Sequence, residues 1–177
     1  IAHCGIFDAG AVEDYELLLC EQPEHYKISP SLALLLATSG STGSPKLVRL
    51  SENNLRSNAN SIVEYLNIDT AQCAITSLPM HYSYGLSVIN SHLSAGASIV
   101  LTDRSLMDPE YWRLIQRHQV SSMAGGPYSY EMLLKLKLER LRIPSIKTMT
   151  QAGGRLSPEK IQRVYDACEG LGIRFFT

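Results

Sequence analysis

The sequence predicts an α/β domain in which helices cover both faces of a mainly parallel sheet. Short apolar runs alternate with helix-like segments along most of the chain, which is the order of strand–helix–strand units. The apolar runs are nearly continuous, as expected for strands that are buried on both faces. The length of 177 residues and the hydrophobic content of 45% allow one sizeable core.

Strands and helices are expected in alternation from residue 32 onward. The expected strands lie at residues 32–37 (a candidate buried strand), 47–50, 73–78, 98–101, 121–124, 146–151 and 173–176. The expected helices lie at residues 52–65, 85–93, 109–115, 130–138 and 158–168. Ser51 is a good N-cap for the first helix, and proline follows Asp108 and Ser157 at two further helix starts.

Residues 1–30 are interpreted as a lead-in strand, at 15–20, followed by a polar linker. Residues 31–177 are interpreted as a central α/β subdomain that is incomplete. The chain starts at Ile1 instead of Met, and it stops at Thr177 directly after an expected strand. We therefore expect it to be a central piece of a longer product.

Composition and charge disfavour several classes of protein. Sixteen basic and 17 acidic residues give a net charge of −1, so nothing favours binding to nucleic acid or to an anionic membrane surface. No apolar run is long enough for a membrane span. The cysteines, Cys4, Cys20, Cys73 and Cys168, form no C-x-x-C pair, so we expect free thiols in a reducing cytoplasm and no metal site.

A loop rich in Ser, Thr and Gly separates two apolar runs. It reads TSGSTGSPK and spans residues 38–46. Its glycines let backbone N–H groups turn toward one point, its hydroxyls add donors, and Lys46 adds a positive charge. These features are typical of an anion cradle for a polyphosphate, although an exposed hairpin turn is the alternative. The glycine spacing differs from that of a Walker A loop, which disfavours a P-loop NTPase.

These nine residues resemble the phosphate-binding signature of the adenylate-forming (AMP-binding) enzymes, which include acyl- and aryl-CoA synthetases, peptide-synthetase adenylation domains and luciferases. Residues 38–46 match the family pattern throughout, whereas Leu47 stands where the family usually has Gly. The resemblance implies that the chain forms part of the large N-terminal domain of such an enzyme. It implies a phosphate-binding set of Thr38, Ser39, Gly40, Ser41, Thr42, Gly43 and Lys46.

The stretch LPMHYSYG, residues 78–85, is similar to the family's Leu-Pro-Leu-Phe-His-x-x-Gly segment. In the family, aromatic and histidine residues of this segment line the pocket for the acyl substrate. His81 falls on the usual Phe and Tyr82 on the usual His, so the resemblance implies Tyr82 as a gate and His81 as a pocket wall. Tyr84 is added to the pocket because a cluster of tyrosines suits an aryl or hydroxylated acid. The alternative for His81 is an ordinary hydrogen-bonded histidine at a strand end.

The stretch QAGGRLSPE, residues 151–159, is similar to the family's Ser-Gly-Gly-Ala-Pro-Leu-Ser segment, with Arg155 in place of the usual Pro. In the family this backbone packs against the adenine ring and the acyl group. The resemblance therefore implies contacts from Ala152, Gly153 and Gly154, whose small size lets a planar ring approach. A strand-to-helix turn explains the same residues and is compatible with that role.

Together these resemblances imply the ATP-dependent activation of a small-molecule carboxylic acid as an acyl-adenylate. Transfer to a thiol follows, from coenzyme A or from the phosphopantetheine arm of an acyl carrier protein. The family's magnesium ligand is expected outside this chain, and no residue here is identified as catalytic. Residues 79–86 contain no acid, which favours a substrate without an ammonium group. The alternative is a non-catalytic nucleotide-binding or structural fragment.

Overall fold

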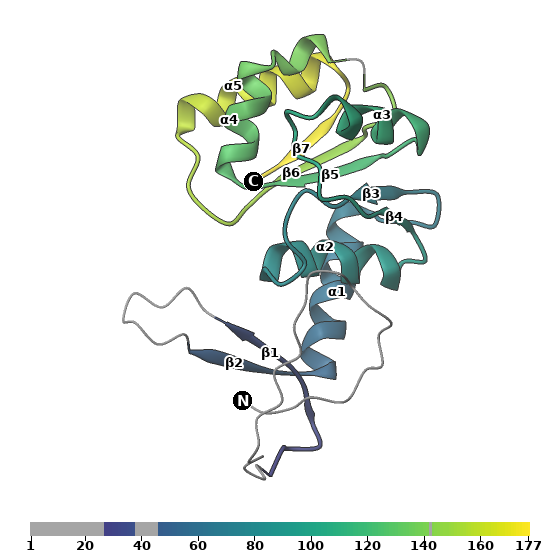
Figure 1. Ribbon diagram of the computed structural model, residues 1–177, viewed down its shortest axis with the longest axis vertical. Coiled ribbons are helices and arrows are strands. Elements are labelled where there is room, and N and C mark those ends of the chain that lie inside the picture. Colours follow the sequence, from purple (N-terminus) through teal and green to yellow (C-terminus); the bar gives the residue numbers. More distant parts are fainter. Residues whose placement is uncertain (1–26, 38–45, 142) are drawn as a thin grey trace.

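The computed structural model describes residues 27–37, 46–141 and 143–177, and its main body is a five-stranded sheet (Figure 1). The order of the strands is β4-β3-β5-β6-β7, and every neighbouring pair is parallel. The parallel sheet expected from the continuous apolar runs is therefore confirmed. The strands are β3 (Cys73–Ile75), β4 (Ser98–Val100), β5 (Ser122–Gly125), β6 (Thr148–Gln151) and β7 (Arg174–Phe176).

Helices cover both faces of this sheet, as expected. The helices α1 (Glu52–Leu66) and α2 (Ser83–Ser94) lie on one face, and α3 (Pro109–Arg117), α4 (Pro127–Lys135) and α5 (Pro158–Gly170) lie on the other (Figure 1). The chain runs from β3 to the edge strand β4, crosses back to β5, and continues outward to β7. Because crossovers between parallel strands are right-handed, this reversal moves the helices from one face to the other.

Local capping explains where three of the helices begin. Ser51 Oγ accepts a hydrogen bond from the N–H of Asn54 (3.2 Å), and Asn54 Oδ1 accepts one from the N–H of Ser51 (3.0 Å). Asp108 accepts from the N–H of Glu110 (2.8 Å), and Ser157 caps α5 in a similar way. Each cap satisfies a helical N–H that would otherwise lack a partner and contributes about 1 kcal/mol. The helix starts expected at these caps are confirmed.

Strands β1 (Leu32–Ala37) and β2 (Leu47–Ser51) form a separate antiparallel pair beside α1 (Figure 1). Ala37 pairs with Leu47, so residues 38–46 connect the two strands. The expectation of a buried strand at 32–37 is wrong, because half-buried and exposed residues alternate along β1. A pair of strands that is covered on one face buries only every second side chain.

Some boundaries differ from the expected ones by a few residues. The strand expected at 73–78 ends at Ile75, and the helix expected at 130–138 begins at Pro127, where proline suits the first helical position. Leu138 instead belongs to the short 3₁₀ helix η1 (Leu138–Arg140). The strand expected at 15–20 lies outside the described residues, and the domain boundary at residue 30 stays a prediction.

The larger core lies between the sheet and the layer formed by α3, α4 and α5. The other face carries a smaller cluster around Leu66, Ile68 and Ala97. Within the part of the chain that is described, no helix is both long and apolar enough to cross a membrane. The fully buried side chains of the larger core include Tyr111, Ile115, Leu133, Met149 and Val164.

Two of the expected free thiols can be located. Cys73 and Cys168 are buried and form no disulfide, and burial raises the pKa of both thiols, that of Cys168 to about 11. Both therefore behave as small apolar core residues near neutral pH. Cys4 and Cys20 lie outside the described residues.

Candidate functional site

The N-terminal end of α2 lies directly against the loop that follows β3. Gly85, in the first turn of α2, permits this contact, because a β-carbon there would lie 2.3 Å from the Pro79 carbonyl oxygen and 3.1 Å from that of Leu78. The Tyr82 N–H donates to the same Pro79 carbonyl at 3.1 Å. The LPMHYSYG segment therefore folds back on itself, and backbone packing accounts for its glycine.

The ring of Tyr82 lies against the loop that follows β6. Gly153 has a φ of +78°, and a β-carbon on it would lie 2.5 Å from Tyr82 Oη. A β-carbon on Gly154 would lie 3.0 Å from Cγ of Pro127. Glycine adopts a positive φ with little strain and leaves room for these neighbours. The segments 78–85 and 151–159, far apart in the sequence, thus meet through a tyrosine ring and a glycine.

Two tyrosine hydroxyls meet at Thr150 of β6. Tyr84 of α2 and Tyr130 of α4 each donate to the Thr150 carbonyl oxygen at 2.8 Å, and Tyr84 Oη also lies 2.6 Å from Thr150 Oγ1. The helices that carry these two tyrosines, α2 and α4, cover opposite faces of the sheet (Figure 1), so one carbonyl joins both helix layers through hydrogen bonds. Burial raises the pKa of both phenols, that of Tyr84 to about 12, so both remain protonated donors at neutral pH.

Gln151 fixes the backbone of the loop at residues 152–154. Its buried side chain donates through Nε2 to the carbonyl oxygens of Ala152 (3.3 Å) and Gly154 (3.1 Å). The Ala152 N–H donates to the Gly125 carbonyl oxygen at the end of β5 (3.3 Å). The loop that the sequence predicts to contact adenine and the acyl group is therefore held by defined hydrogen bonds.

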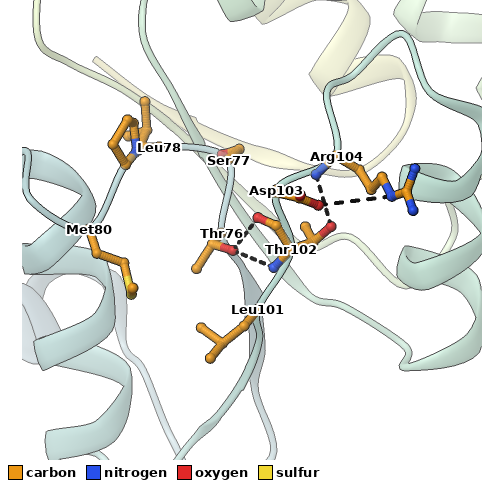
Figure 2. A pocket seen from close by; sticks show the side chains of 9 residues that line it. Thr76, Ser77, Leu78, Met80, Leu101, Thr102, Asp103 and Arg104 are labelled. Carbon is orange, nitrogen blue, oxygen red and sulfur yellow. Dashed lines mark hydrogen bonds and ion pairs between the residues drawn. The ribbon is translucent and has the colours of Figure 1, made fainter. Parts of the chain in front are cut away.

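Two cavities border these segments, and the larger, of about 650 Å³, lies beyond β3 and β4 (Figure 2). Thr76 Oγ1 donates to the Thr102 carbonyl (3.0 Å) and accepts from the Thr102 N–H (2.8 Å). Arg104, at the rim, is paired with Asp108 at 3.2 Å. The polar side chains of Thr76 and Arg104 are therefore already engaged within the protein.

The smaller cavity, of about 460 Å³, lies between the β1–β2 hairpin, α1, α2 and the loop after β6. None of its described lining residues is charged. The side chains of Asn58 of α1 and Asn90 of α2 have no hydrogen-bond partner within the described part of the chain, so their carboxamides are available to a ligand. The lining residues are Leu36, Leu50, Asn54, Leu55, Asn58, Tyr82, Ser83, Tyr84, Leu86, Ser87, Asn90, Ala152 and Gly153.

The structure brings several predicted site residues together. Tyr82, Tyr84, Ala152 and Gly153 all line the smaller cavity, whereas His81 is exposed and lines neither cavity. Gly154 and Lys46 are exposed, the latter directly before β2. The remaining residues of the predicted phosphate loop lie outside the described residues, and their roles stay predictions: Thr38, Ser39, Gly40, Ser41, Thr42 and Gly43.

No three His, Cys, Asp or Glu side chains gather as a metal site in the described ranges 27–37, 46–141 and 143–177. Magnesium is bound by oxygen ligands, mostly carboxylates, phosphates and water.

Sequence reasoning named Tyr130 only as one of a cluster of tyrosines, and it missed the other residues that support the site. Tyr130, Thr150 and Gln151 form the network behind the loop, and Asn58 and Asn90 line the cavity. The partners of the network belong to different elements; Tyr84 and Thr150, for example, are 66 positions apart. No spacing within a single helix or strand marks such a group in advance.

The comparison with sequence families decides what these segments belong to. The model for "AMP-binding enzyme" matches residues 4–174. This chain belongs to the AMP-binding enzyme family. The match includes the phosphate loop, the LPMHYSYG segment and the glycine loop after β6, so the resemblance found in the sequence is confirmed.

Two curated members of the AMP-binding family illustrate its range. The chain is 30% identical over 146 residues to a phenyloxazoline synthase of Mycolicibacterium paratuberculosis, covering 81% of this chain and 12% of that protein. It is 28% identical over 143 residues to a 2-succinylbenzoate–CoA ligase of Enterococcus faecalis, covering 81% of this chain and 28% of that protein. The chain thus spans less than a third of the length of either relative.

Solved structures of the family share the fold. An O-succinylbenzoate coenzyme A synthetase from Bacillus subtilis in complex with AMP superposes with a TM-score of 0.68 at 25% identity, covering 81% of this chain and 29% of that one. The same Bacillus enzyme in complex with an acyl-adenylate intermediate gives a TM-score of 0.68 at 26% identity, covering 82% of this chain and 36% of that one. The fold is therefore that of the N-terminal domain of AMP-binding enzymes.

Proposed function

We propose that this chain is the part of an AMP-forming acid–thiol ligase that holds the phosphates of ATP and walls the acyl pocket. One observation carries the proposal: three segments far apart in the sequence, 32–50, 78–85 and 151–159, contribute residues to one cavity whose described lining is uncharged. The last two resemble the family's acyl and adenine motifs, and the first contributes Leu36 and Leu50, which flank the loop that resembles the phosphate motif. Their convergence is what a shared substrate requires.

The proposed reaction has two steps. A carboxylate oxygen of the acid attacks the α-phosphorus of ATP, the bond to the bridging oxygen breaks, and pyrophosphate leaves. A thiol sulfur then attacks the acyl carbon, AMP leaves with the electron pair of the acyl–oxygen bond, and the thiol proton passes to solvent. A carboxylate is already ionised at neutral pH, so the first step needs no general base, and catalysis rests on positioning and charge neutralisation.

The roles proposed for the residues follow from these steps. The loop at 38–46 holds the β- and γ-phosphates, and Ala152, Gly153 and Gly154 contact the adenine and the acyl group. Tyr82 suits a gate because its side chain is 38% exposed and forms no capping hydrogen bond on α2. Tyr84 suits a fixed wall because its hydroxyl is bonded to Thr150.

The lining of the smaller cavity favours a class of substrate. Carboxamides and hydroxyls, such as those of Asn58, Asn90 and Ser87, stand beside leucines, and the described lining includes no acid that could pair an ammonium group. We therefore propose an aryl, fatty or hydroxylated acid rather than an amino acid. The relative from Enterococcus faecalis, by its name, acts on 2-succinylbenzoate, and the acceptor proposed here is coenzyme A or a carrier-protein arm.

An ATP–pyrophosphate exchange assay tests the proposal on the full gene product that contains residues 1–177. The panel contains benzoate, hydroxybenzoates, a medium-chain fatty acid and several amino acids. Exchange is expected with a carboxylic acid that has no amino group. The double change Ser41→Ala with Thr42→Ala should lower the exchange rate at least tenfold. The matched control is Ser57→Ala with Thr70→Ala, at exposed positions outside the loop. A folded protein without exchange on any acid would reject the ligase.

A nucleotide-binding module without chemistry is the second candidate. It requires only the loop at 38–46 and a cavity such as the one lined by Tyr82, Ala152 and Gly153, with no step of bond making. ATP binding that is weakened by Ser41→Ala with Thr42→Ala, in a protein that exchanges no pyrophosphate, would select this candidate.

A further inference from the structure

The junction of α2, β6 and α4 contains a hydrogen-bond network that the proposed reaction does not use directly. Its centre is the carbonyl oxygen of Thr150, which accepts from Tyr84 and Tyr130 at 2.8 Å each. Tyr130 is 1% exposed, and the side chain of Gln151 continues the network into the loop at 152–154.

From this geometry we propose that Tyr84 and Tyr130 are positioning residues for the substrate site. They hold the end of β6, and with it the loop at 152–154, at a fixed place relative to the start of α2. The inference rests on the proposed function in that this loop is taken to contact adenine and the acyl group. Neither hydroxyl is assigned a role in bond making or bond breaking.

The two bonds tie the Thr150 carbonyl to two separate helices. Tyr84 belongs to α2, on one face of the sheet, and Tyr130 to α4, on the other face (Figure 1). Two donors that belong to different helix layers restrain the carbonyl relative to both layers. Thr150 is followed directly by Gln151, so a restrained carbonyl fixes the point from which the loop departs.

Tyr82 and Tyr84 stand two positions apart at the start of α2. Tyr82 and Tyr84 contact the same short stretch of chain, one through the ring against Gly153 and the other through the hydroxyl on Thr150. Tyr84 is thus the anchor of the helix start, and Tyr82 can change its rotamer while the helix stays in place. A gate that moves on a fixed hinge requires this division of roles between neighbouring residues.

The hydroxyl groups of Tyr84 and Tyr130 can be removed without removing their rings. A phenol bonded to a backbone carbonyl contributes a direction as well as an attraction, which phenylalanine at the same place would lack. Removing one ordinary buried hydrogen bond shifts an equilibrium by about fivefold. Tyr84→Phe and Tyr130→Phe each keep the ring and remove only the hydroxyl, so they isolate the positioning effect from the packing of the core.

Two measurements test the inference. In the 177-residue chain, NMR order parameters report the mobility of the Gly153 and Gly154 amides. In the full gene product, exchange kinetics give kcat and the KM values for ATP and the acid. Tyr84→Phe and Tyr130→Phe are expected to lower the order parameters of both glycines and to raise KM about fivefold, with kcat within twofold. Tyr165→Phe, on the exposed side of α5, is the matched control.

Two further variants keep the test decisive. Thr150→Val removes the Tyr84–Oγ1 bond but keeps the carbonyl, so a smaller effect of the same kind is expected. The double change of Tyr84 and Tyr130 to Phe should raise KM by less than the product of the two single fold-changes, because the first loss already frees the carbonyl. If Tyr130→Phe does not fold, the half-buried Tyr84 alone decides.

The outcomes separate this inference from the proposed function. If the wild-type protein exchanges pyrophosphate with no acid, the ligase proposal fails, and the glycine order parameters still decide the positioning inference. If the glycines of Tyr84→Phe are as ordered as those of Tyr165→Phe, the inference is overturned. A fall in kcat without a change in KM also overturns it, because that result would place the hydroxyl in the chemical step.

Discussion

Gly85→Ala tests whether the start of α2 is set by a backbone contact that only glycine permits. The added β-carbon would lie 2.3 Å from the Pro79 carbonyl oxygen, about 1 Å closer than an ordinary C···O contact. The obstacle is backbone, so the helix start or the loop must shift, and overpacking of this kind costs about 1–3 kcal/mol. The better helix propensity of alanine returns up to about 1 kcal/mol. Because the contact is very short and its partner is backbone, the upper end of the first range applies, and the net loss expected is about 2 kcal/mol.

Urea denaturation followed by circular dichroism measures this loss. Thermal unfolding followed by the same signal gives a second measure, because for a chain of this length a loss of about 2 kcal/mol corresponds to a fall of about 4–8 °C in Tm. The matched control is Gly170→Ala in α5, where a β-carbon would meet no atom within 4 Å and the free energy of unfolding should stay equal or rise slightly. If Gly85→Ala is as stable as the wild type, the close approach of α2 to Pro79 is not present in solution.

The other predictions concern a buried histidine, a cap and a loop glycine. His92 is buried, which lowers its pKa below the ordinary 6.5. As the pH falls, this histidine therefore takes up a proton in the unfolded chain before it does so in the folded one. The free energy of unfolding is highest above about pH 6.5 and decreases below it. The urea midpoint should fall more steeply between pH 7 and 5 in the wild type than in His92→Gln; equal slopes would contradict this. Ser51→Ala should cost about 1 kcal/mol of unfolding free energy, against less than 0.5 kcal/mol for the exposed Ser57→Ala. Gly153→Ala, with its positive φ and its contact with Tyr82, should lower Tm measurably, and an unchanged Tm would refute the packing of that ring.

The features that the sequence predicted well are those whose causes lie within a few residues. The starts of α1, α3 and α5 depend on Ser51, Asp108 and Ser157, whose side chains bond the N–H groups of the first turn of the following helix. Such caps act in the same way wherever the helix packs. The parallel sheet was predictable for a related reason, because strands covered on both faces need apolar residues at every position.

The hairpin shows where this reasoning fails. The sequence LALLLA of β1 gives no alternation from which a polar face could be read, so its burial depends on what lies beside it. In the described part of the chain only one neighbouring layer, including α1, lies beside it (Figure 1). The site was only partly predictable for the same reason. Motifs located the three segments that meet, but the bonds of Tyr84 and Tyr130 to Thr150 require α2 and α4 on opposite faces, which follows from strand order.

Strand order also explains why the smaller cavity lies beside the centre of the sheet. In open parallel sheets, ligands bind at the carboxyl ends of the strands where the order reverses, here between β3 and β5. Ser77 closes this point by donating to the Ala124 carbonyl, and Gly85 and Val88 of α2 cover it. The cavity that remains there has a volume of about 10 Å³, which holds one water molecule at most. Two further cavities, of about 650 and 460 Å³, border the segments 78–85 and 151–159. Thr76 and Arg104 already have partners in the larger one. In the smaller one, the side chains of Asn58 and Asn90 form no hydrogen bond with described residues, so the proposed function places the ligand in the space between α1 and α2.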